Sequence, residues 1–168
     1  MRVIPHTSRF WVGLLLTLTL SGCTGDDQPA ITAKRIAPDF TLTLFNGQEF
    51  KLSQHQGHPV IINFFASWCI PCGEEAPVLE AAYQELKPQG VVFVGVAGQD
   101  TPSKAEGFVK KWGMTFPTGL DATGKILEAY GVYGMPTTFF IDRAGVINDL
   151  HIGGVTKELI HYELAKMH

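Results

Sequence analysis

The sequence predicts an α/β fold: a three-layer sandwich in which helices cover both faces of a central mixed sheet, preceded by an N-terminal β-hairpin. Nearly continuous apolar runs at 59–65 and 91–97 are typical of strands buried on both faces, and a helical pattern lies between them. Two further strand patterns, 137–141 and 146–151, come before a final helical segment. A strand–helix–strand unit followed by two strands and a helix indicates a mixed sheet between two helical layers.

The N-terminal hairpin is predicted by its turn. Residues 39–44 and 49–52 alternate apolar and polar side chains, and Asn46-Gly47 lies between them. Asn and Gly accept the positive φ angles of a tight hairpin turn, so this pair is the strongest short-range hairpin signal.

The first helix is expected over 70–86, where apolar residues recur at helical spacing. Pro77 lies inside this pattern and predicts a kink, because proline lacks the N–H that the helix needs there. A second helix is expected after Thr101-Pro102, a capping residue followed by proline at the first helical position. That helix should stop at Gly113.

The last third of the chain continues in the same way. A short helix over 124–130 ends at Gly131, and a tight turn over 142–145 joins the two later strands. Thr156 is placed to cap a final helix that runs to about Met167.

The composition excludes one broad class of partner. The chain has 168 residues, of which 45% are hydrophobic and 17% charged, enough for one globular domain and a short extension. The formal net charge of −3 leaves no basic excess, so no nucleic-acid partner is expected.

The N-terminal residues have the pattern of an export signal. Arg2 and Arg9 precede an apolar run over 10–20, which is too short to span a bilayer, since that takes roughly 20 apolar residues. The run ends in Leu20-Ser21-Gly22-Cys23. This segment resembles the bacterial lipobox, whose cysteine is lipidated and becomes the first mature residue. The alternative is a plain signal peptide cut near Gly22, with Cys23 incidental.

The lipobox resemblance implies three parts: a lipoprotein signal peptide over 1–22, a lipidated tether over 23–36 and a folded domain over 37–168. Lipid chains on Cys23 would hold the protein to a bacterial membrane, because each buried methylene contributes roughly 0.8 kcal/mol. We therefore expect a lipid-anchored, extracytoplasmic protein on the periplasmic side.

The chemistry of the chain is predicted to lie in its C-x-x-C pair, Cys69 and Cys72. Cys69 falls where a buried strand ends and a helix begins, and the free N–H groups of a helix N-terminus favour the reactive thiolate. Cys69 is therefore the expected nucleophile. Cys72 follows at i+3 on the same helix face, close enough to attack a mixed disulfide on Cys69. Between them, Ile70 places an apolar surface beside the sulfur, and Pro71 occupies an early helical position where its missing N–H matters little.

Two structural roles compete with redox chemistry for this pair. A structural zinc site usually takes four ligands, but the chain has no second cysteine pair and no H-x₃₋₅-H spacing. A purely structural disulfide would close a very small loop, which stabilises a fold only slightly. We expect no metal, and no cofactor besides the redox-active Cys69–Cys72 disulfide itself.

Two longer segments carry a family resemblance. The segment from Asn63 to Pro77 (NFFASWCIPCGEEAP) is similar to the TlpA/ResA/CcmG branch of the thioredoxin superfamily, and so is the segment from Tyr130 to Asp142 (YGVYGMPTTFFID). The resemblance covers roughly Ala37 to the C-terminus. It implies a thioredoxin-like fold and the activity of a thiol–disulfide oxidoreductase.

The resemblance also implies a substrate-binding surface. Pro136 matches the superfamily's cis-proline, which lies against the dithiol and helps to bind the substrate chain. Met135, just before it, would offer backbone groups to the substrate. Trp68, packed as a lid beside Cys69, would complete this surface together with Ile70 and Pro71.

An acidic residue is implied in the same way. Glu75 matches a carboxylate that tunes the dithiol in this branch, and burial could raise its pKa until it relays a proton to or from Cys72. The alternative is a solvated acid on the helix face, like Glu74. Asn63 stands where ordinary cytosolic thioredoxins carry a buried Asp. Because Asn cannot titrate, the proton role is expected to move to Glu75.

Three classes of function fit a thiol-bearing domain, and a thiol–disulfide oxidoreductase is the expected one. A thiol-dependent peroxidase of the peroxiredoxin type resembles P-x-x-x-[T/S]-x-x-C, and neither Cys69 nor Cys72 follows that pattern. A copper-delivery module of the Sco type resembles C-x-x-x-C, one residue longer than the spacing here. These two remain the alternatives.

The expected direction is reduction of protein disulfides. Ile70 and Pro71 add no positive charge that would stabilise the thiolate as heavily as in strong oxidants. Because the extracytoplasmic space is oxidising, such a reductase must itself be re-reduced. By resemblance, the partners are a membrane thiol-transfer protein as electron donor and a protein disulfide as acceptor. Apocytochrome c, in cytochrome c biogenesis, is the family's best-known acceptor.

Overall fold

The computed structural model describes residues 35–167. The predicted signal peptide, the predicted lipidation site Cys23 and nearly all of the predicted tether lie outside the described residues. Within 35–167, no helix is both long enough and apolar enough to cross a membrane.

The described residues contain a mixed sheet of six strands in the order β1-β8-β7-β4-β5-β6. β4 is central: it runs parallel to β5 and antiparallel to β7. The strand bounds are β1 Arg35–Ile36, β4 Val60–Phe65, β5 Val92–Ala97, β6 Thr118–Leu120, β7 Thr137–Ile141 and β8 Val146–Ile152.

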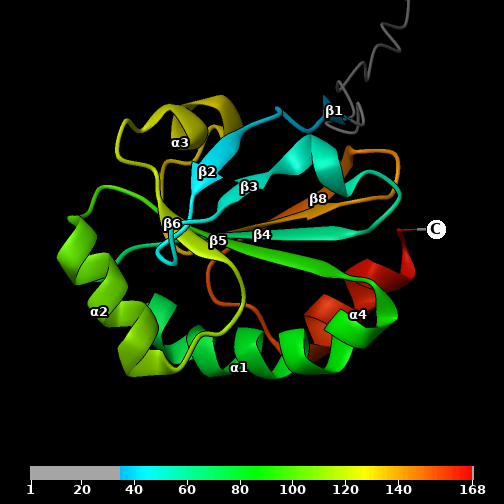
Figure 1. Ribbon diagram of the computed structural model, residues 1–168. Helices are drawn as coiled ribbons and strands as arrows, with labels where there is room; N and C mark the ends of the chain where they lie inside the picture. Colours follow the sequence, from blue (N-terminus) through cyan, green and yellow to red (C-terminus); the bar gives the residue numbers. More distant parts are fainter. Residues whose placement is uncertain (1–34, 168) are drawn as a thin grey trace, which may run out of the picture. The chain divides into compact units, whose positions relative to one another are not determined.

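Helices cover both faces of this sheet (Figure 1). Three of them, α1, α2 and α4, pack on one face, and α3 packs on the other together with the separate hairpin of β2 and β3. The predicted three-layer α/β sandwich with an N-terminal hairpin is confirmed. The bounds are β2 Thr41–Thr43, β3 Glu49–Lys51, α1 Ile70–Leu86, α2 Pro102–Trp112, α3 Lys125–Tyr130 and α4 Lys157–Ala165, with short 3-10 helices η1 Leu52–His55 and η2 Lys87–Gln89.

β4 separates the two halves of the core, because all six of its side chains are buried. Alternate residues of a strand point to opposite faces of the sheet. Ile61 and Phe65 therefore pack with the helices α1, α2 and α4, whereas Ile62 and Phe64 pack with α3 and the hairpin. Asn63 lies between Ile61 and Phe65 in this alternation, so its polar side chain faces α1.

The hairpin is tied to the edge of the sheet at Gly119 in β6. Leu44 forms an isolated antiparallel bridge with Gly119, and the N–H of Phe45 donates to the carbonyl oxygen of Thr118 at 2.9 Å. A side chain at Gly119 would overlap the carbonyl oxygen of Thr43, so this close approach of two backbones requires glycine.

Two strands and one cap differ from the sequence prediction. β1 pairs with β8, although its residues fall in the segment that the sequence assigned to the tether. β6 was not predicted, because three residues with a central glycine carry no alternating pattern. Thr101 occupies the N-cap position of α2, yet its side chain makes no capping hydrogen bond. Thr156 does cap α4 as predicted, since its hydroxyl accepts from the N–H of Leu159 at 3.2 Å.

Candidate active site

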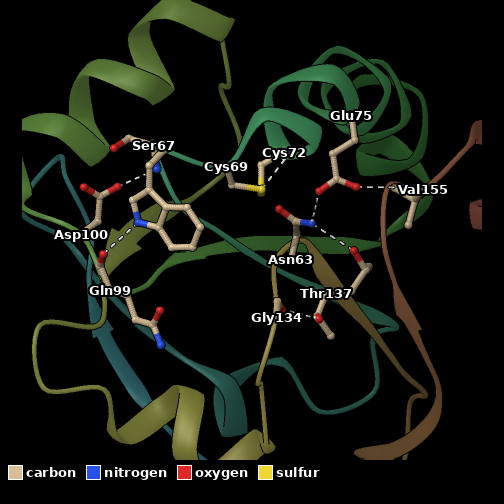
Figure 2. Close-up of a disulfide and its surroundings, with 12 residues drawn as sticks. Asn63, Ser67, Cys69, Cys72, Glu75, Gln99, Asp100, Gly134, Thr137 and Val155 are labelled. Atoms are coloured by element: carbon tan, nitrogen blue, oxygen red, sulfur yellow. Dashed lines mark hydrogen bonds between the residues drawn. A yellow bond between two sulfur atoms is a disulfide. The ribbon is translucent and has the colours of Figure 1, made fainter.

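The two cysteines lie at the start of α1, directly after the loop that leaves β4 (Figure 2). They form a disulfide with a Cα–Cα distance of 5.3 Å. Cys69 is the N-cap residue of α1, and its Sγ accepts a hydrogen bond from the N–H of Cys72 at 3.2 Å. The sulfur of Cys69 thus occupies the place where a helix N-terminus stabilises negative charge.

The two sulfurs differ in what they face. Both cysteines are buried, but Cys69 keeps 5% of its surface exposed and Cys72 only 1%. Cys69 also lines an open groove at the protein surface, and Cys72 does not. A partner can therefore reach Cys69 first, which is the order that the sequence predicts for attack and resolution.

Glu75 lies in the interior, one helical turn after Cys72. Only 3% of its surface is exposed, whereas the neighbouring Glu74 lies on the outside of the helix. Its Oε1 accepts from Nδ2 of Asn63 at 2.8 Å, and its Oε2 accepts from the N–H of Val155 at 2.9 Å (Figure 2). Nδ2 of Asn63 also donates to Oγ1 of Thr138 in β7 at 3.0 Å. The carboxyl group is therefore held from β4 and from the segment before α4.

Burial is the largest influence on the pKa of this carboxyl group. Loss of hydration raises the pKa of Glu75 to about 7, although the hydrogen bonds from Val155 and Asn63 act in the opposite direction. Near neutral pH the group is therefore present in both protonated and ionised forms. A group with this property, on the same helix as the dithiol, is suited to accept and return a proton.

The rim of the site is apolar and exposed. Ile70 exposes 77% of its surface and Trp68 exposes 59%. Nε1 of Trp68 donates to the carbonyl oxygen of Gln99 at 3.0 Å, which holds the indole beside the loop after β5. Trp68 is therefore less enclosed than the expected packed lid, because more than half of the surface of the residue is exposed. Pro71 is also exposed.

Asp100 supports the loop that carries the dithiol. Its Oδ2 accepts from the N–H of Ser67 at 2.6 Å (Figure 2). Its Oδ1 accepts from the N–H of Thr101 at 2.8 Å. One carboxylate thus joins the start of the active-site loop to the start of α2. The sequence does not indicate this role of Asp100, because nothing in its neighbourhood points to a contact across 33 residues.

The peptide bond between Met135 and Pro136 is cis, as the resemblance implies. Thr137, the next residue, pairs with Phe64, so Pro136 lies at the same end of the sheet as the loop to Cys69. Met135 is half-buried against the core cluster that includes both cysteines. The carbonyl oxygen of Pro136 accepts from the N–H of Gly153 at 2.9 Å. The cis-proline loop is thereby joined to the segment that donates to Glu75.

The hydrogen-bond network around Glu75 is the main part of the site that the sequence does not indicate. Asn63 was identified only as a residue that cannot titrate, and Thr138 and Val155 were not identified at all. The strand alternation around Asn63 was the available signal, since it places a polar side chain on the α1 face. Among the described residues, no group of three or more His, Cys, Asp or Glu side chains is arranged to hold a metal ion.

Comparison with known proteins gives the family. The family model described as AhpC/TSA family matches residues 33–150. The chain belongs to the AhpC/TSA family. Over 138 residues it is 37% identical to the thiol-disulfide oxidoreductase ResA of Geobacillus kaustophilus, which covers 82% of this chain and 79% of that protein. It is also 37% identical over 125 residues to ResA of Bacillus subtilis, covering 74% of this chain and 70% of that protein.

A solved structure extends the likeness to the fold of this AhpC/TSA family member. A thiol:disulfide interchange protein of the thioredoxin family from Chlorobium tepidum matches with a TM-score of 0.73 and 26% identity, covering 80% of this chain and 96% of that chain. The predicted thioredoxin-like fold and the predicted class of enzyme are confirmed. The chain is a ResA-like thiol–disulfide oxidoreductase, and Cys69 and Cys72 are its redox pair.

The raised pKa of Glu75 predicts a dependence of stability on pH. Between about pH 4.5 and 7, the folded protein keeps a proton on Glu75 that the unfolded chain has released. Folding is therefore favoured at the acidic end of this window, and the free energy of unfolding should fall by about 3 kcal/mol as the pH rises through it. Glu75→Gln should remove this fall, because glutamine does not titrate.

Urea unfolding of the oxidised protein at pH 5 and pH 8 measures the effect. Glu74→Gln, a change of the exposed neighbour, is the matched control and should keep the pH dependence of the native chain. Equal pH dependence in the native chain and Glu75→Gln would contradict the buried, titrating carboxyl group.

Proposed function

We propose that the protein is an extracytoplasmic reductase of protein disulfides. Cys69 attacks the substrate, Cys72 resolves the mixed disulfide, and Glu75 exchanges a proton with Cys72. One observation carries this assignment of roles: Cys69 opens onto a surface groove, while Cys72 and Glu75 lie buried behind it on the same helix.

The reaction proceeds in two exchanges. The Cys69 thiolate attacks one sulfur of the substrate disulfide, so that a Cys69–substrate disulfide forms and the other substrate sulfur leaves as a thiolate. Cys72 then gives its proton to the Glu75 carboxylate and attacks Sγ of Cys69. The Cys69–Cys72 disulfide forms, the second substrate sulfur leaves, and two electrons have passed to the substrate.

The direction follows from the environment and from the residues inside the motif. Ile70 and Pro71 supply no charge that would hold Cys69 as a strongly stabilised thiolate, which is the property of oxidising pairs. An oxidising compartment does not regenerate a dithiol. A membrane thiol-transfer protein is therefore the proposed electron donor.

Apocytochrome c is the proposed acceptor. Its haem-attachment motif, C-x-x-C-H, holds two cysteines that an oxidising compartment joins, and haem attachment needs them reduced. The proposal rests on the similarity to ResA proteins, whose names describe thiol–disulfide oxidoreductases.

A lipid anchor at Cys23 is proposed from the sequence alone. The apolar run over 10–20 and the small residues before Cys23 support a lipoprotein signal. The tether after Cys23 would then keep the dithiol near the membrane donor.

The equilibrium reduction potential tests the direction. We expect a value below about −200 mV, which is the range of reducing thioredoxin-like pairs. Equilibration of the protein with defined ratios of reduced to oxidised dithiothreitol measures it. A value well above this limit would identify an oxidase or isomerase instead.

Trapping tests the order of attack. Cys72→Ser removes the resolving thiol, so mixed disulfides between Cys69 and substrates should accumulate on exported proteins. The matched variant Cys69→Ser keeps only the more buried thiol and should accumulate far fewer. Non-reducing electrophoresis followed by mass spectrometry identifies the trapped proteins. An empty Cys72→Ser trap would count against protein disulfides as substrates.

The anchor is tested by replacing Cys23. Cys23→Ser should abolish incorporation of radiolabelled palmitate and reduce the amount of protein that sediments with membranes. Thr24→Ser, a conservative change of the next residue, should leave both unchanged. Label retained by Cys23→Ser would contradict lipidation at this residue.

A further inference from the structure

A groove of about 510 Å³ opens beside Cys69, between the start of α1 and the exposed side of α2. These two helices pack on the same face of the sheet (Figure 1). None of Tyr133, Met135 and Pro136 lines the groove, so it is a different surface from the cis-proline loop. Cys69 lies at its α1 side, together with Ile70, and Trp112 belongs to its α2 side.

Two lysines of α2, Lys104 and Lys111, line this groove. They are seven residues apart, which places them on the same face of the helix about 10 Å apart along its axis. Within residues 35–167, neither forms an ion pair, whereas the neighbouring Lys110 bonds to Glu106 at 2.6 Å. Glu74 is the one carboxylate among the lining residues, so positive charge is in excess.

Gly107 adds a second feature, because it leaves the backbone of α2 bare in the groove. It lies in the middle of the helix, where glycine is about 1 kcal/mol less favourable than alanine. No atom lies within 4 Å of the position that a Cβ would take, so packing does not explain the glycine. The ring of Trp112, also on α2, packs directly on Gly73 of α1. The groove is therefore open to close approach by another chain.

We propose that this groove, which we call the lysine groove, binds an acidic segment of the protein whose disulfide Cys69 attacks. The inference rests on the proposed function as a reductase of protein disulfides. The exposed side chains of Trp68 and Ile70 already mark the rim of Cys69 as a contact surface for a macromolecule. Lys104 and Lys111 make the groove positively charged. Acidic residues beside the substrate cysteine would therefore be attracted to it, and basic residues would be repelled.

Two matched peptides test the proposal. Each has the same length and one internal disulfide, and they differ only in four residues before the first cysteine, which are Asp and Glu in one and Lys in the other. The reduced full-length protein should reduce the acidic peptide roughly fivefold to tenfold faster at low salt. The difference should shrink at 0.5 M salt, because exposed charges are screened.

Variants locate the effect. The double change Lys104→Glu and Lys111→Glu should abolish or reverse the preference for the acidic peptide. Lys110→Glu changes the charge of the same helix outside the groove and should retain the preference. Gly107→Leu should slow reduction of both peptides, because the new side chain occupies the groove. Each rate is divided by the rate of the same variant with bis(2-hydroxyethyl) disulfide, which is small and uncharged.

The outcomes distinguish failure of the lysine groove from failure of the proposed function as a reductase. Equal rates with both peptides, a preference for the basic peptide, or an acidic preference that survives the double change would overturn the lysine groove while leaving the reductase intact. Reduction of bis(2-hydroxyethyl) disulfide without reduction of either peptide would overturn the proposed function itself.

Discussion

The buried carboxyl group of Glu75 is the constraint on which the arrangement of this site depends. Taking a carboxyl group out of water is unfavourable unless hydrogen bonds replace its hydration. Here the replacement comes from Asn63 in the central strand and from the N–H of Val155 before α4, and Thr138 in β7 accepts from the same amide of Asn63. These bonds join the first turns of α1, two strands and the segment after β8. These hydrogen bonds therefore help to fix the position of α1, the helix that carries the dithiol.

The same segment also links the carboxyl group to the substrate side of the site. Gly153, two residues before Val155, donates to the carbonyl oxygen of the cis-proline Pro136. On the other side of Cys69, Asp100 joins the active-site loop to the start of α2. Cys69 thus lies between two hydrogen-bonded connections. One joins Glu75 to the cis-proline loop through the segment 153–155. The other joins the active-site loop through Asp100 to α2, which lines the lysine groove. A substrate chain that contacts both surfaces would meet Cys69 between them.

Stability and chemistry make opposite demands on Glu75. Burial disfavours the ionised form, and an apolar side chain would pack there without that disadvantage. A carboxyl group with a pKa of about 7 can, however, accept a proton from a buried thiol and return it at neutral pH. A polar group buried in an otherwise apolar core is expected mainly at functional sites.

The sequence by itself determined the elements and the reacting pair: α1 begins and ends as predicted, β4 and β7 lie within one residue of their predicted bounds, and Cys69 stands at the N-cap. Such features are local, because apolar periodicity and capping residues act over a few positions. β6 and the partners of Glu75 were decided by tertiary structure. Gly119 forms part of β6 only because the backbone of β5 lies beside it. Glu75 accepts a hydrogen bond from Val155, which is 80 residues away in the sequence. Burial of an acid depends on what folds over it, and no local pattern contains that information.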